Sequence, residues 1–127
     1  MEISERIEYF LDKKKYDEAL NLCRSKDLDY LKQIVTGYLE QGNLEAVMKK
    51  ISNSFKFYNN RDLQYSIIKR LMKTGKPECC DAALEICNRD VHKLDDDIQY
   101  KAILMYIIKE DYDSALKICN NQLFKHT

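Results

Sequence analysis

One eight-residue phrase occurs three times in the chain, as YDEALNLC (Tyr16–Cys23), CDAALEIC (Cys80–Cys87) and YDSALKIC (Tyr112–Cys119). A weaker fourth copy reads LEAVMKKI, with Val47 in place of the alanine and Ile51 in place of the last cysteine. The small residue of the phrase recurs at intervals of 28, 36 and 32 residues, at Ala19, Val47, Ala83 and Ala115. This spacing indicates an internal repeat of about 32 residues.

Each copy is preceded in the chain by another segment, in which apolar residues recur every three or four positions, as they do in an amphipathic helix. Breaks at Gly42 and Gly75 suit the left-handed turn that ends a helix. The pattern therefore predicts an all-α fold of four helix–turn–helix units, about eight helices, at residues 1–27, 28–58, 61–92 and 95–124. One hairpin of this size cannot bury its apolar stripe alone, so we expect the four to stack as an α-solenoid in a single domain, residues 1–127.

Two stretches, GYLEQGNLEAV (Gly37–Val47) and IIKEDYDSALKI (Ile107–Ile118), resemble the tetratricopeptide repeat. That family places a small residue and an aromatic residue in its first helix, then a turn, then an alanine early in its second helix. The early tryptophan and the closing proline of the family pattern are absent from the units of this chain. The resemblance implies a right-handed solenoid that binds a protein or peptide on its concave face.

The repeated cysteines are predicted to be packing positions. In a helix, Ala19 and Cys23 lie on the same face because they are four residues apart, and the same holds for the later copies. Ile51 takes the cysteine position in the weak copy, and isoleucine can replace a buried thiol but not a metal ligand. We expect the following repeat positions to be structural: Ala19, Cys23, Val47, Ile51, Ala83, Cys87, Ala115 and Cys119.

Cys79 and Cys80 admit two other interpretations. With Cys87 and His92 they form CC-x6-C-x4-H, which departs from the paired CxxC spacing of most zinc sites, so we predict no metal and no cofactor. Cys80 occupies a repeat position and is expected in the core. Cys79 is expected to be the exposed thiol, and a thiol-sensing protein switched at Cys79 and Cys80 is the alternative function.

Composition narrows the class of protein. Lys plus Arg and Asp plus Glu are 21 each, so the basic excess of a nucleic-acid-binding protein is missing. No apolar run approaches the roughly 20 residues of a membrane span. The five cysteines suit a reducing compartment, and we expect a cytoplasmic or nuclear protein that is not secreted. The chain has no glycine-rich phosphate loop and no convincing nucleophile–base pair, so we predict that it is not an enzyme.

The stretch AILMYII (Ala102–Ile108) is apolar all round the predicted helix, which calls for burial on both sides. Its outer side needs a cover: the C-terminal tail, a partner peptide or a second copy of the chain. We therefore predict a protein-interaction module, acting as adaptor or inhibitor, with homodimerisation through the C-terminal hairpin as one option. The predicted partner-binding residues are Tyr65, Lys69, Lys73, Tyr100, Leu104 and Ile108.

Overall fold

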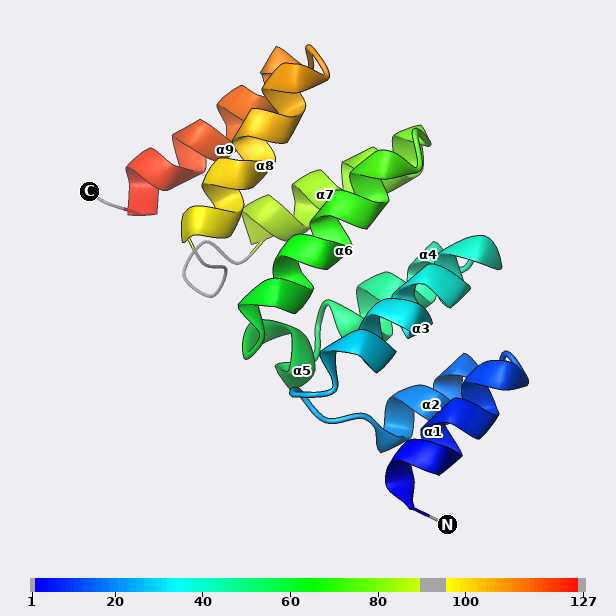
Figure 1. The fold of residues 1–127 in the computed structure, drawn as a ribbon. Coiled ribbons are helices and arrows are strands. Elements are labelled where there is room, and N and C mark those ends of the chain that lie inside the picture. Colours follow the sequence, from blue (N-terminus) through cyan, green and yellow to red (C-terminus); the bar gives the residue numbers. More distant parts are fainter. Residues whose placement is uncertain (1, 90–95, 126–127) are drawn as a thin grey trace. The chain divides into compact units, whose positions relative to one another are not determined.

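The computed structural model describes residues 2–89 and 96–125 (Figure 1). Every regular element in this part of the chain is helical, which confirms the predicted all-α class. The chain divides into two compact units, Met1–Ser66 and Ile67–Thr127. The elements are α1 (Ile3–Asp12), α2 (Tyr16–Leu22), α3 (Leu28–Glu40), α4 (Leu44–Ala46), the π-helical turn η1 (Val47–Ile51), α5 (Phe55–Tyr58), α6 (Arg61–Lys73), α7 (Pro77–Arg89), α8 (Asp96–Ile108) and α9 (Tyr112–Lys125).

These boundaries follow the predicted segments with two departures. The second helix of the second hairpin changes from α4 into the π-helical turn η1 after three residues. A short helix, α5, follows it and was not predicted. The unit boundary falls inside α6, so the third hairpin begins in the first unit and ends in the second.

Four turn residues at corresponding positions adopt the left-handed backbone region. They are Lys14, Gly42, Gly75 and Glu110, with φ of +57°, +70°, +72° and +62°. At three of the turns the same pair of hydrogen bonds closes the preceding helix. The bonds are Lys14 N–H to Leu11 O and Lys15 N–H to Phe10 O, Gly42 N–H to Leu39 O and Asn43 N–H to Tyr38 O, and Glu110 N–H to Ile107 O and Asp111 N–H to Tyr106 O. Each pair is a Schellman motif, so the repeat in the sequence corresponds to a repeated local geometry.

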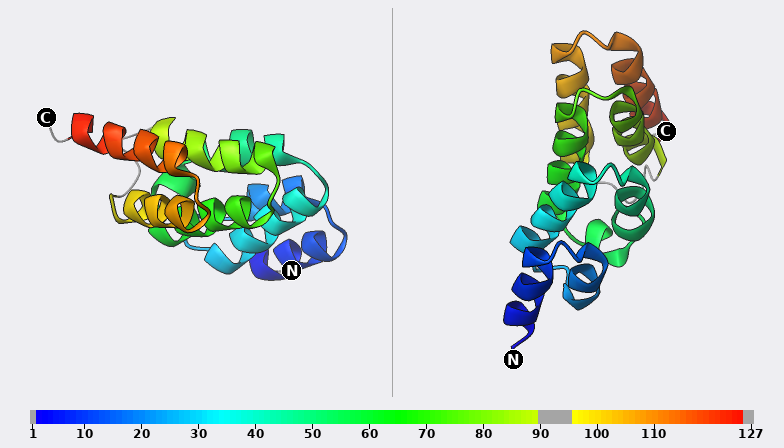
Figure 2. Two further views of the ribbon diagram at one scale, coloured as in Figure 1. Left: turned by 90° about the horizontal axis from the view of Figure 1, so that it is seen from above. Right: turned by 90° about the vertical axis from the view of Figure 1, so that its right-hand side faces the viewer.

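In the first unit, α1 and α3 form one layer and α2 and α4 the other (Figure 2). The side chains facing between the layers are fully buried: Ile7, Ala19, Leu31, Ile34, Val35 and Val47. Gly37 of α3 sits directly against Tyr16 of α2. A Cβ at position 37 would lie 2.1 Å from Cζ of that ring, so only glycine allows this approach. The Tyr16 ring also meets the Tyr38 ring edge to face at 5.7 Å between centroids.

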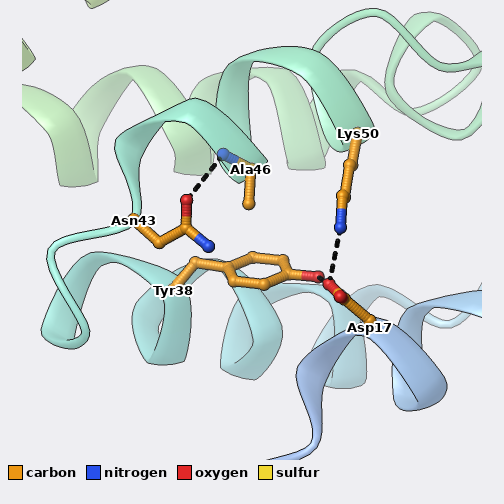
Figure 3. A network of polar contacts seen from close by, with 5 residues as sticks. All are labelled: Asp17, Tyr38, Asn43, Ala46 and Lys50. Atoms are coloured by element: carbon orange, nitrogen blue, oxygen red, sulfur yellow. Dashed lines mark hydrogen bonds and ion pairs between the residues drawn. The ribbon is translucent and has the colours of Figure 1, made fainter.

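A polar network joins three helical segments of the first unit (Figure 3). Oδ1 of Asp17 accepts a hydrogen bond of 2.5 Å from the Tyr38 hydroxyl and one of 2.9 Å from Nζ of Lys50. The Tyr38 hydrogen bond, followed by that from Lys50, lowers the pKa of Asp17 from its usual 3.8. Burial and the same hydrogen bond raise the pKa of Tyr38. The Asn43 side chain caps α4 by accepting from Ala46 N–H at 3.1 Å.

In the second unit, the end of α6 and α8 form one layer, and α7 and α9 form the other (Figure 2). The hydroxyl of buried Tyr106 donates to the carbonyl of Cys80 at 3.0 Å. The buried Gln99 amide donates to the carbonyl of Cys87 at 2.8 Å. Lys109 donates to the carbonyl of Met72 at the end of α6. Hydrogen bonds from Gln99, Tyr106 and the following Lys109 therefore fix α8 to α7 and α6.

Candidate protein-interaction surface

The two faces of α8 differ in their surroundings, although both are apolar. The inner face, formed by Ile98, Gln99, Ala102 and Tyr106, is buried. The opposite side, called here the outer face, consists of four large side chains that are 49%, 59%, 43% and 80% exposed: Tyr100, Leu104, Ile107 and Ile108. The burial expected for the inner face is found, whereas the outer face is exposed among the described side chains, and its expected cover stays a prediction.

The helical period explains why these four residues share one face. Leu104, Ile107 and Ile108 follow Tyr100 by four, seven and eight residues, and in an α-helix such positions form a single stripe. The inner face is tied down by the hydrogen bonds of Gln99 and Tyr106 to α7. The outer face is therefore a preformed apolar ridge on a helix whose rotation about its axis is fixed.

The next helix adds two exposed apolar side chains. On α9, Ala115 and Ile118 are buried, whereas Tyr112 and Leu116 are exposed. In the first unit the exposed large apolar residues are Ile3, Tyr9 and Phe55, which lie singly or as a pair on α1 and α5. Single exposed apolar residues are ordinary on protein surfaces, whereas the second unit has six on two consecutive helices.

The predicted binding residues of α6 lie on one face of that helix because they are four residues apart. Tyr65 belongs to the first unit and is half-buried. Lys69 is half-buried and Lys73 is exposed, and both belong to the second unit. Within that unit, these lysines and the outer face of α8 come from helices of the same layer (Figure 2). The structure does not combine Tyr65 with the α8 residues in one unit.

The predicted repeat positions lie in the interior, with one partial exception. Ala19, Val47, Ile51, Ala83 and Cys87 have no exposed surface, and Cys23 and Ala115 have very little. Cys119 is half-buried. Burial raises the pKa of Cys23 to about 11 and that of Cys87 to about 12, which keeps both sulfur atoms in the unreactive thiol form.

The prediction for the adjacent cysteines is wrong, because Cys79 is buried and Cys80 is half-exposed. Helix α7 buries Cys79, Ala82, Ala83, Ile86 and Cys87, a stripe with intervals of three, one, three and one residues. Cys80 falls beside this stripe. The repeat position had suggested burial for Cys80, but its counterpart Tyr112 is 61% exposed.

The structure adds little to the metal hypothesis. Within residues 2–89 and 96–125, no three His, Cys, Asp or Glu side chains are grouped closely enough to hold a metal ion. His92, the last member of the CC-x6-C-x4-H arrangement, lies outside the described residues. In the same part of the chain, no helix has the length and apolar character to cross a membrane.

Comparisons with known proteins supply no relative. No family model, curated protein or solved structure matches this chain.

Proposed function

We propose that this chain is a protein-interaction module that binds a protein or peptide segment through the outer face of α8. The observation that carries the proposal is the row formed by Tyr100, Leu104, Ile107 and Ile108, exposed along one face of a helix whose opposite face is anchored. An aromatic side chain such as Tyr100 is a typical anchor of an interface, and burial of the aliphatic side chains adds the hydrophobic contribution of their area. We propose a role in binding rather than in catalysis.

A docking partner would displace water from the apolar side chains on the outer face of α8. Because α8 is already fixed by its hydrogen bonds, little conformational entropy is lost when a partner docks. Lys73, exposed at the end of α6, would favour a partner with an acidic stretch by electrostatic steering. In this proposal the chain acts as an adaptor or an inhibitor, in the cytoplasm or the nucleus.

The larger architecture belongs to the same proposal. Four hairpins stacked as a right-handed solenoid of the tetratricopeptide type would present α1, α3, α6 and α8 as successive first helices. The left-handed residue two positions after the first helix of each hairpin is in keeping with a common repeat, because it gives the four turns a similar local geometry.

Site-specific photocrosslinking in the protein's own cells tests the proposal. A photoreactive amino acid at position 104 should give discrete crosslinked proteins. The same group at position 55, which is 77% exposed in the native chain, is the matched control and should not give them. Ile108→Asp should weaken binding of a crosslinked partner by about 30-fold, the effect of losing roughly 2 kcal/mol from an interface anchor. The same crosslinks from both positions would contradict the proposal.

A further inference from the structure

Helices α2 and α9 begin with nearly the same phrase, but its side chains are buried to very different extents. YDEALNLC and YDSALKIC share the tyrosine, the aspartate, the alanine, the first leucine and the last cysteine. Leu20 of α2 is 5% exposed, whereas Leu116 at the same position of α9 is 59% exposed. Cys23 is buried and Cys119 is half-buried. One set of side chains is therefore a packed face in the first unit and an exposed face in the second.

Helix α3 shows what such a face binds. Gly37 sits directly against the Tyr16 ring, and the hydroxyl of Tyr38 donates to the Asp17 carboxylate at 2.5 Å. Nζ of Lys50 donates to the same carboxylate oxygen at 2.9 Å. A glycine followed by a tyrosine in the covering helix thus receives the aromatic ring and binds the aspartate of the phrase.

A related contact occurs in the second unit between α7 and α8. Tyr38 and Tyr106 each precede the left-handed turn residue of their hairpin by four positions. The Tyr106 hydroxyl donates at 3.0 Å to the carbonyl of Cys80, which has the position of Tyr16 in the repeated phrase. In both units, therefore, a tyrosine of the next helix donates a hydrogen bond near the start of the phrase helix.

Helix α9 presents the groups that α3 binds on α2. Tyr112 is 61% exposed, and Asp113 is exposed with no side-chain partner among the described residues. We infer that the face formed by Tyr112, Asp113 and Leu116 binds a helix of another protein that carries an adjacent Gly–Tyr pair. The glycine receives the Tyr112 ring, and the tyrosine donates to Asp113. The inference goes beyond the proposed function, because its surface lies on α9 and not on the outer face of α8.

The occupant is a different protein because this chain has already used its own Gly–Tyr pair. Of its three glycines, only Gly37 precedes a tyrosine. That position is filled, since a Cβ there would lie 2.1 Å from the Tyr16 ring. A second copy could offer the pair only by separating α3 from α2. Because three side chains make a small contact, we expect weak, reversible binding with a Kd of about 0.1 mM.

NMR titration of the full chain with a peptide of residues 28–51 measures the contact. The peptide supplies Gly37, Tyr38 and Lys50 and models the partner helix. At about 1 mM peptide, well above the expected Kd, the amides of residues 112–119 should shift and those of α1–α3 should not. Leu116→Asp should weaken binding at least about tenfold, because an apolar contact is lost and a charge is desolvated. Leu104→Asp, on the outer face of α8, is the matched control and should bind like the native chain.

Variants of the peptide test the two contacts that define the partner. Tyr38→Phe in the peptide and Asp113→Ala in the chain should each weaken binding about fivefold, as expected for loss of one hydrogen bond. Together they should weaken it no further, because both remove the same bond. Gly37→Ala in the peptide should weaken binding about tenfold by overpacking against Tyr112, although alanine favours the helix. Unshifted α9 amides, or undiminished binding of the Gly37→Ala peptide, would overturn the inference.

Photocrosslinking at position 116 in the protein's own cells identifies the natural occupant. Mass spectrometry should locate the crosslink in another protein, within about four residues, or one helical turn, of a Gly–Tyr pair. A crosslink to this chain, a crosslink to a segment without such a pair, or no crosslink overturns the inference. None of these results affects crosslinks from position 104, so the proposed function and this inference fail separately.

Discussion

Side-chain hydrogen bonds join the helices of both units, but the second unit also has a row of exposed apolar side chains along α8. In Met1–Ser66, Tyr38 and Lys50 converge on Asp17, and Asn60 donates to the carbonyl of Ser25 at 2.7 Å. In Ile67–Thr127, Leu104 and Ile108 are 59% and 80% exposed. The difference teaches that exposed large apolar side chains are distributed differently: singly or as a pair in the first unit, and as a row along one helix in the second. In the function proposed above, that row is the surface that a partner would bury.

The largest expected change in the free energy of unfolding comes from a substitution on the inner face of α8, compared with one on its outer face. Tyr106→Ala should destabilise the second unit by about 4 kcal/mol, the usual cost of removing a fully buried aromatic side chain. Leu104→Ala should change stability by less than about 0.5 kcal/mol, because surface substitutions seldom do more. Urea denaturation followed by circular dichroism measures both.

Hydrogen exchange in the same variants shows which unit loses stability. The amides of α7–α9 should lose protection in Tyr106→Ala, while those of α1–α3 keep it. Equal destabilisation by the two alanine substitutions would show that the outer face of α8 is covered within the chain, and would remove the contrast between the units.

The second prediction concerns the closest approach within the first unit. Gly37→Ala should destabilise that unit by about 3 kcal/mol, because a Cβ would overlap the Tyr16 ring and such overpacking is costly. In a Tyr16→Ala background, where the ring is gone, the same change should be favourable by up to about 1 kcal/mol, since alanine is the better helix former. Thermal denaturation of the four proteins of this double-mutant cycle measures the reversal of sign.

Gly42→Ala is a control for the backbone. A Cβ there meets nothing within 4 Å, but φ is +70°, so the expected cost of about 1 kcal/mol comes from conformation alone. If Gly37→Ala cost the same in both backgrounds, close packing against Tyr16 would not be the reason for the glycine.

The sequence predicted the periodic features of the fold well because each periodic residue is constrained by a local rule. Helical spacing identified the segments, and the substitution of Ile51 for cysteine identified a buried packing position. The exposed residues Tyr100, Leu104 and Ile108 were selected because the resemblance to the tetratricopeptide repeat implies that the first helix of each hairpin lines the binding face. Which side would be exposed depends on contacts with α7 that no local pattern contains.

Other features were missed because tertiary packing, rather than the local sequence pattern, determines them. Cys79 and Cys80 are both near the helical stripe of Ala83, and only the packing of α7 decides which one is buried. The buried amides of Gln64 and Gln99 donate to carbonyls of Phe57 and Cys87. A signal for them was present, since LQY (63–65) and IQY (98–100) repeat the same three-residue pattern.

A substitution in the polar network of the first unit should change the free energy of unfolding by less than the two substitutions above. Tyr38→Phe should destabilise that unit by about 1 kcal/mol, the typical contribution of one hydrogen bond. The pKa of Asp17 should rise towards 3.8, because the main cause of its lowering is gone. Since the folded pKa of Asp17 is lowered, its contribution to stability is present above pH 3.8 and is lost as the pH falls through the folded pKa. NMR titration of the carboxyl carbon and denaturation at pH 7 and pH 2 measure both effects. An Asp17 pKa unchanged by the substitution would show that Tyr38 does not hold the carboxylate.

The smallest expected change in the free energy of unfolding comes from glycine substitutions in two turns. These substitutions test whether each unit can be stabilised separately. Lys14 and Glu110 occupy turn positions where the other two hairpins have glycine, and a side chain is strained at positive φ. Lys14→Gly should therefore stabilise the first unit, and Glu110→Gly the second, each by about 0.5 kcal/mol after the added flexibility of the unfolded chain is subtracted. Hydrogen exchange should show slower opening of α1 and α2 in the first variant and of α8 and α9 in the second. A gain spread over both units from either change would mean that they unfold together, in which case the contrast between them is one of surface chemistry alone.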